Sequence, residues 1–140
     1  MAYVALFPDA AERIADEVQV RHRAAFGSTL TTTNRTPNPR PAEFAKVILV
    51  GGVRRDQVTD VPTLAVEAWA ASRSRASTLA QEVRAVIHSL VGATFAGYAV
   101  QDVAEYAGPG DLPDPLSDQS RYSATYAVTI RSEIAVNINP

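Results

Sequence analysis

The stretch Ser74-Arg-Ala-Ser-Thr-Leu-Ala-Gln-Glu-Val-Arg-Ala-Val-Ile-His-Ser-Leu-Val91 decides the fold, because it is the clearest helix in this sequence. Its apolar residues recur every three or four positions and fall within an arc of roughly 100°, the width of a core-facing stripe. The stripe consists of Ala76, Leu79, Val83, Val86, Ile87 and Leu90. Ser72 or Ser74 can cap the start of the helix, and Gly92 can end it. We therefore expect a helix over 74–91 with this stripe in the core.

Strands are predicted on both sides of this helix. They cover the ranges 43–50, 62–70, 97–107 and 121–134. Gly51 and Gly52 are expected to end the first strand, so that residues 53–61 form a polar hairpin loop. In the last strand, apolar residues from Tyr122 to Ile130 alternate with polar ones, which gives one dry and one wet face. The sequence thus predicts two hairpins, one before and one after the central helix.

A second helix is predicted over residues 8–26, where Pro8 and Asp9 suit the first turn. One face of this helix is apolar and contains Ala11, Ile14, Val18 and Ala25. Arg21 falls at the edge of that face, and Val20 lies on the opposite side. Two interpretations remain open: the helix end overhangs the core while Arg21 reaches water, or the end meets a neighbouring subunit.

The order helix, hairpin, helix, hairpin predicts an α+β fold. We expect a mainly antiparallel sheet of about four strands with two helices packed on one face. The 140 residues fit a single domain over 1–140. Within it, residues 28–42 form a Pro- and Thr-rich connection, in which Thr29–Thr33 can be an extended edge segment. Residues 132–140 form a C-terminal tail.

Composition limits the possible functions. The formal net charge of −2 argues against generic nucleic-acid binding, which needs a strongly basic domain. The chain has no cysteine, so disulfides, thiolate catalysis and cysteine-based zinc sites are excluded. The apolar start, Met1–Phe7, is short and lacks a basic flank, so we expect no signal peptide. No apolar run approaches the ~18 residues that span a bilayer, so we expect a soluble protein without a membrane partner.

The sequence contains no pattern typical of catalysis. His88 is expected in solvent on the polar face of its helix, and His22 lies between Arg21 and Arg23, a cationic neighbourhood that opposes metal binding. Neither histidine has a second ligand four residues away. Gly51-Gly-Val-Arg-Arg55 fits neither a P-loop nor a dinucleotide-binding turn, and its glycines favour a bulge or turn. We therefore predict no enzyme activity, no cofactor and no metal.

Two charged loops are the candidate contact sites. They carry Arg54, Arg55 and Asp56 in the hairpin loop, and Asp111, Asp114 and Asp118 in the loop 108–120. The aspartates are three and four residues apart with prolines between them, unlike a calcium-binding EF-hand, so an ordered contact loop is favoured over a metal site. The loops either contact nothing, pair with each other across a subunit interface, or contact another protein.

Several segments, in their order and spacing, resemble the tail terminator (tail completion) proteins of long-tailed bacteriophages. They are Pro39-Arg-Pro-Ala-Glu-Phe44, Val50-Gly-Gly-Val-Arg-Arg55, Val58-Thr-Asp-Val-Pro-Thr-Leu-Ala-Val-Glu-Ala-Trp-Ala70, the helix Ala76–Leu90, and Gly110-Asp-Leu-Pro-Asp-Pro115 before Arg121-Tyr122. The segments lie within residues 39–131, about two-thirds of the chain. Residues 28–36 and the tail after Ser132 are outside the resemblance.

The resemblance implies a mixed α/β structural subunit rather than an enzyme. Such subunits assemble into a hexameric ring that caps the tail tube, ends its polymerisation and joins the tail to the head connector. The implied partners are further copies of the chain, the tail tube protein and the connector or neck protein, while DNA only passes through the lumen. The implied location is the head-proximal end of the virion tail, after synthesis in the bacterial host cytoplasm. The alternatives are another phage neck or head-completion protein, or a small non-viral binding module.

Overall fold

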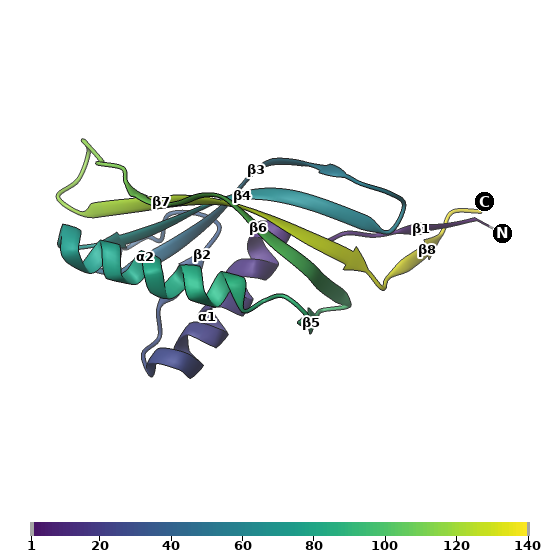
Figure 1. Cartoon of the computed structure of the whole chain (residues 1–140), viewed down its shortest axis with the longest axis horizontal. Helices are drawn as coiled ribbons and strands as arrows, with labels where there is room; N and C mark the ends of the chain where they lie inside the picture. Colours follow the sequence, from purple (N-terminus) through teal and green to yellow (C-terminus); the bar gives the residue numbers. More distant parts are fainter. Residues whose placement is uncertain (1, 140) are drawn as a thin grey trace.

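The computed structural model describes residues 2–139, and within them it contains two helices and eight strands. The helices are α1 (Ala10–Phe26) and α2 (Arg73–His88). The strands are β1 (Tyr3–Ala5), β2 (Thr31–Thr33), β3 (Phe44–Arg54), β4 (Thr59–Ala70), β5 (Thr94–Phe95), β6 (Tyr98–Asp111), β7 (Ser120–Ser132) and β8 (Ala135–Asn137). The predicted α+β class is therefore confirmed (Figure 1).

The predicted sheet of about four strands with two helices on one face is wrong in its details. Six strands form one curled sheet in the order β2-β3-β4-β7-β6-β5, and β1 and β8 form a separate two-stranded sheet. All described pairs are antiparallel except β2 with β3, so the main sheet is mixed. The four additional strands have only two or three residues each, too few to display an alternating pattern.

Both hairpins are longer than predicted. Gly51 and Gly52 do not end β3; they lie beside a bulge between Leu49 and Gly51, and the strand continues to Arg54. A β-carbon on Gly52 would stand 2.3 Å from the Val61 carbonyl oxygen, so the second glycine lets the two strands approach closely. The expected loop over 53–61 thus shrinks to a turn between β3 and β4. The expected loop over 108–120 likewise shrinks to residues 112–119 between β6 and β7.

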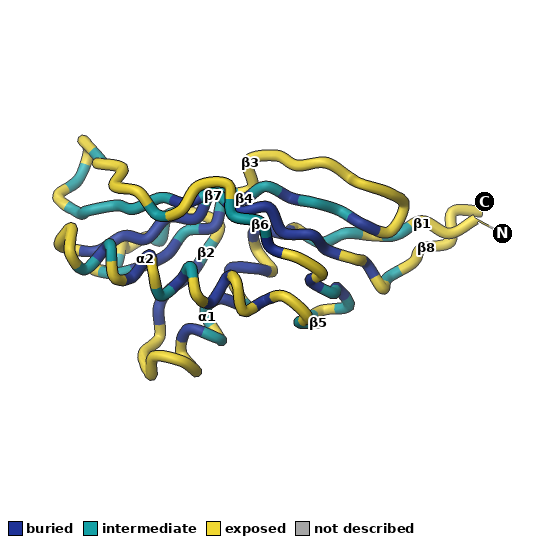
Figure 2. Tube along the Cα trace, in the orientation of Figure 1, coloured by how far each residue is buried: buried dark blue, intermediate teal, exposed yellow. Residues whose placement is uncertain are grey.

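The core is built as the helix pattern predicts. Leu79, Leu90 and Ile87 are fully buried, and Val83 and Val86 are nearly so. Helix α2 packs on β4, β6 and β7, while α1 packs on β2, β3 and α2. The buried residues of both helices and of the strands form one cluster, visible as the dark blue stretches of Figure 2.

Helix α1 begins and ends at recognisable caps. The Asp9 side chain accepts a hydrogen bond from the Glu12 N–H, and Gly27, with φ of 78°, ends the helix. Ala25 is exposed, contrary to prediction, because the last turn of α1 extends beyond the strands. Arg21 pairs with Glu17 and donates to the Ser89 carbonyl, so it lies at the edge of the core.

The connection and the tail contain more structure than expected. Thr31–Thr33 of the 28–42 connection form the edge strand β2, which confirms the predicted edge segment. Residues Ala135–Asn137 of the 132–140 tail form β8 and pair with β1, so this part of the tail is not loose. Pro140 lies outside the described residues. No helix within residues 2–139 is long and apolar enough to cross a membrane.

Candidate functional site

The first predicted contact loop is the turn at the tip of the β3–β4 hairpin. The Arg54 guanidinium donates to the carbonyl oxygens of Ala5 and Gln57, each at 3.0 Å, and lies over the Phe7 ring. Arg54 therefore fastens the N-terminal segment to the hairpin and is not a free surface charge. The side chain of Arg55 is exposed, and within residues 2–139 its charge acts on the neighbouring Asp56 without a hydrogen bond or close ion pair. Arg55 is the residue of the tip that is available for a contact.

Asp56 has a local structural role in the same turn. Its carboxylate accepts a hydrogen bond from the Val58 N–H at 2.9 Å. This bond, followed by one from the Thr59 hydroxyl, holds the pKa of Asp56 below its ordinary value. The interaction is the short-range turn bond that aspartate commonly makes to the backbone two residues later. Asp56 thus shapes the tip.

The second predicted contact loop, between β6 and β7, is largely neutralised within the chain. Asp111 forms an ion pair with Arg73 at 3.3 Å. Asp114 accepts hydrogen bonds from the Ser117 hydroxyl and the Leu116 N–H, which lower its pKa, and it faces Arg40 at 3.9 Å. Asp118 is exposed. Two of the three acids of this loop are therefore already paired within the chain.

The structure does not bring the two loops together within one chain. The β3–β4 tip lies at the end of the molecule that also carries β1 and β8, and the β6–β7 loop lies at the other end (Figure 1). A contact between them therefore requires two copies. This arrangement is compatible with the predicted pairing, although the internal ion pairs of Asp111 and Asp114 weaken the electrostatic reason for it.

A cluster around Trp69, here called the Trp69 clasp, was not predicted from the sequence. Trp69 stacks on Phe44 with ring centroids 5.3 Å apart, and the guanidinium groups of Arg40 and Arg121 each lie 5.0 Å from its ring. Its indole N–H donates to Glu67, whose other oxygen lies 3.6 Å from Arg121. These cation–π and charged contacts keep Trp69 buried on the sheet.

The clasp joins two segments that are distant in sequence. The Gln119 side-chain amide donates to the carbonyl oxygens of Pro41 and Ala42, each at 3.0 Å. Arg40 reaches the same loop through Asp114. The end of the 28–42 connection and the β6–β7 loop are therefore fixed to each other at one end of the sheet.

The opposite end of the molecule is apolar and open to solvent. Exposed large apolar side chains gather on the terminal strands and on the outer half of the β3–β4 hairpin. We call this group the apolar end; it comprises Tyr3, Val4, Leu6, Leu49, Val50, Val53, Val58, Val136 and Ile138. Val53 is 71% exposed, although it is part of a regular strand. Where exposed apolar side chains gather on one part of a soluble protein, they mark a candidate interaction site.

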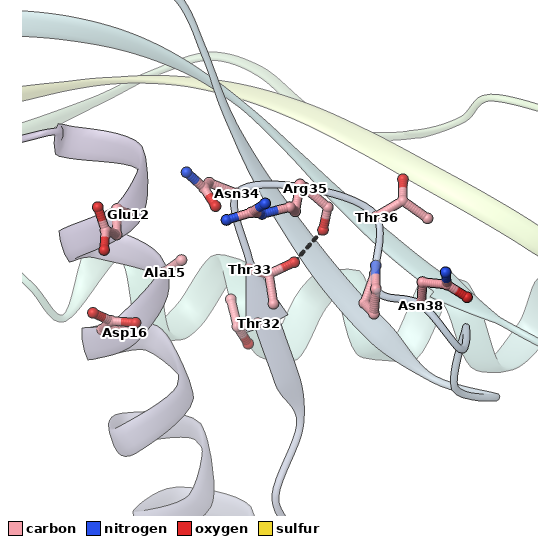
Figure 3. A pocket seen from close by; sticks show the side chains of 10 residues that line it. Glu12, Ala15, Asp16, Thr32, Thr33, Asn34, Arg35, Thr36 and Asn38 are labelled. Atoms are coloured by element: carbon pink, nitrogen blue, oxygen red, sulfur yellow. Dashed lines mark hydrogen bonds between the residues drawn. The ribbon is translucent and has the colours of Figure 1, made fainter.

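A polar pocket of about 480 Å³ lies between α1 and the start of the 28–42 connection (Figure 3). Glu12 and Asp16 face it from consecutive turns of α1. Thr32 to Asn38 form the opposite wall, where the Thr33 hydroxyl donates to the Arg35 carbonyl. The pocket is open and polar, which suits a contact surface better than an enclosed reaction site.

Both histidines bind carboxylates, which the sequence did not predict. His22 is buried, and its Nε2 lies 2.8 Å from Glu82 of α2, which also faces Arg75. His88 is partly exposed, as expected, but its Nε2 lies 3.2 Å from Glu105. No cluster of three or more potential metal-binding side chains occurs in residues 2–139.

A salt bridge joins α2 to β6. Arg84 donates two hydrogen bonds to Glu105, at 2.7 and 2.6 Å. Arg84, followed by His88, holds the pKa of the Glu105 carboxyl below its ordinary value of 4.5. Beside this group, burial raises the pKa of Tyr126 to about 12.

A scan of family models and a search of curated proteins found no match to this chain.

Proposed function

We propose that this chain is a structural virion protein of a long-tailed bacteriophage. In this proposal it is one subunit of a hexameric ring that caps the tail tube, ends tube polymerisation and joins the tail to the head connector. The resemblance of residues 39–131 to tail terminator proteins supports the proposal from the sequence. The structural support comes chiefly from one observation, the apolar end.

The apolar end supports an assembled protein because the exposure of its side chains to water is unfavourable in a free monomer. Nine large apolar side chains are exposed there, on strands and adjoining turns rather than on a flexible loop. Burial of apolar surface contributes roughly 25 cal/mol per Å², so covering such a surface favours association. A tail subunit would bury this surface against other copies or against the tube.

The charged groups also suit a ring. In a closed ring, one patch of each subunit meets a different patch of the next subunit. The exposed Arg55 and the exposed acids Asp102 and Asp118 lie on different elements of the chain. Like charges repel at a wrongly docked interface, whereas opposite charges on different patches set the register.

Imaging of tails tests the proposal. Tails are purified from cells infected with phage that carries an epitope-tagged copy of the gene, and antibody-labelled particles are compared with tails from a gene deletion. We expect label on a six-fold ring at the head-proximal end, and tubes of uncontrolled length without the gene. Unlabelled tails of normal length, with heads attached in the deletion, would refute the proposal. Label at the neck but not on the tube would favour another head-completion protein.

A small non-viral binding module is the second candidate, and the pocket of Figure 3 favours it. The pocket offers two acids, several hydroxyls and two asparagines to a polar ligand. This candidate predicts a stable monomer or dimer in solution. Native mass spectrometry of the full chain across protein concentration separates it from a ring subunit, which gives hexamers or assembles only on the tube.

A further inference from the structure

The two edges of the main sheet are open over most of their length. On one side, β2 pairs only with residues 44–46 of β3, so residues 47–54 have β4 as their only strand neighbour. On the other side, β5 pairs only with residues 98–99 of β6, so residues 101–111 have β7 as their only strand neighbour. An open edge presents unpaired backbone N–H and C=O groups to any strand that can reach it.

The middle of the β3 edge carries no charge and no proline, two of the features that normally prevent pairing with another chain. This uncharged part, Val47-Ile-Leu-Val-Gly-Gly-Val53, lies between Lys46 and Arg54 and contains one bulge after Leu49. Soluble proteins usually protect such an edge with lysines, prolines or a covering segment, because an apolar open edge promotes aggregation. Val50 and Val53 are 57% and 71% exposed on this edge. The stretch is therefore suited to pairing with a further strand.

We propose that the free β3 edge of one copy pairs with the free β6 edge of a second copy, so that the main sheet continues from subunit to subunit. The closed ring in which this occurs rests on the proposed function, whereas the pairing itself depends only on the two edges. The partner is a second copy of this chain because both edges are present in each copy and lie on opposite sides of the sheet.

The strand directions suit this joint. β3, β4, β7 and β6 are successive antiparallel neighbours, so β3 and β6 run in opposite directions. Two copies placed side by side in the same orientation would thus form an antiparallel joint, which has straight, strong hydrogen bonds. The joint is head-to-tail, with a different edge from each copy, as a closed ring requires.

The register across the sheet brings the two free stretches to the same height. When the paired residues are followed from β3 through β4 and β7 to β6, Ile48 is in the row of Ala107, Leu49 is in the row of Glu105, and Gly51 is in the row of Ala104. The short strands β2 and β5 cover opposite ends of their edges, so in an unshifted joint neither blocks the free stretch of the other copy.

The side chains of the two edges are complementary at that height. Val50 lies at the bulge of β3, and Tyr106 lies at one of the three irregularities of β6, between Glu105 and Ala107. The two residues stand in adjoining rows and are both exposed. The joint therefore buries an aromatic ring against branched apolar side chains, a favourable cross-strand pair. At one end of the joint, the exposed Arg55 would lie near the exposed Asp102.

Cysteine cross-linking tests the joint on a clean background, because the chain has no cysteine of its own. The variant Val50→Cys/Tyr106→Cys is oxidised as the concentrated full chain and in tails, and the covalent species are counted on a non-reducing gel. We expect a ladder that ends at six chains. Each single variant should remain monomeric, and Val20→Cys/Tyr106→Cys, with its first cysteine on an exposed part of α1, is the matched control.

Charge exchange gives an independent readout. Arg55→Glu should reduce the ladder of the cysteine variant roughly tenfold, and Arg55→Glu/Asp102→Arg should restore it. A dimer from Val50→Cys alone would show that two β3 edges pair with each other and would overturn the proposal. So would a double-cysteine variant that cross-links no better than the control in both samples. Tails with a six-fold ring but no ladder would refute the joint and leave the proposed function standing. A ladder without labelled tails would support the joint and refute the proposed function.

Discussion

Replacing Leu79 by Ala should lower the free energy of unfolding by about 3 kcal/mol. The Leu79 side chain is fully buried between α2 and the sheet. The change removes three carbons, which at ~0.8 kcal/mol each amounts to ~2.4 kcal/mol of lost burial. The rigid strands β4, β6 and β7 prevent complete collapse of the site, so a cavity term adds to this loss, and the range for such changes is about 2–5 kcal/mol. The free energy of unfolding of a domain of this size is roughly 5–15 kcal/mol, so the variant should still fold.

Urea unfolding followed by tryptophan fluorescence measures this cost. The chain has one tryptophan, Trp69, and it is buried in the clasp, so its emission reports the native sheet. With a slope of about 2 kcal/mol per molar urea, the midpoint should fall by roughly 1.5 M. Leu116→Ala is the control, because Leu116 is 92% exposed and its loss should change the midpoint little. A Leu79→Ala midpoint equal to that of the control, at the same protein concentration, would refute the proposed core.

Three further changes test other parts of the structure. Gly52→Ala should destabilise the hairpin by more than ~2 kcal/mol, because the added β-carbon would meet the backbone of β4. Gly51→Ala has open space around the added β-carbon and should cost only about 1 kcal/mol, from the positive φ of this residue. Equal urea midpoints for the two variants would contradict this. The Glu105 carboxyl has a lowered pKa in the folded state, so its stabilising effect is present above pH 4.5 and is lost as the pH falls below that value. Melting curves of Arg84→Met should consequently depend less on pH in this acid range than those of the wild type, and identical slopes would exclude the ion pair as the cause. Arg40→Met should shift tryptophan emission to longer wavelength while changing the free energy of unfolding by about 1 kcal/mol or less, and an unchanged spectrum would argue against the clasp.

The helices could be predicted closely from the sequence, because their signals are local. The apolar stripe of α2 and the capping residues at Asp9 and Ser72 depend only on spacing and on neighbouring residues. Strand ends were less predictable. Gly51 and Gly52 are usual strand breakers, and only the close approach of β4 shows that they are part of a continuous strand.

The candidate contact residues show the limit of sequence reasoning more clearly. The sequence identifies Arg54, Arg55 and Asp111 as charged loop residues, but it does not reveal which charges are already paired. Arg54 is held by a carbonyl 49 residues away, and Asp111 by Arg73 on α2. Such long-range partners follow from the tertiary structure, so only Arg55 of these three remains available as a free contact.

The Trp69 clasp has a consequence for the order in which the chain folds. Its hydrogen bonds join residues 77 and 78 positions apart, whereas β3 and β4 are joined by a turn of a few residues. The entropy lost on closing a loop grows with the logarithm of its length, so the β3–β4 hairpin can form early, while the clasp must wait for β7 to join the sheet. In a rapid-mixing refolding experiment, burial of the single tryptophan should therefore be among the last events, after most of the backbone hydrogen bonds have formed.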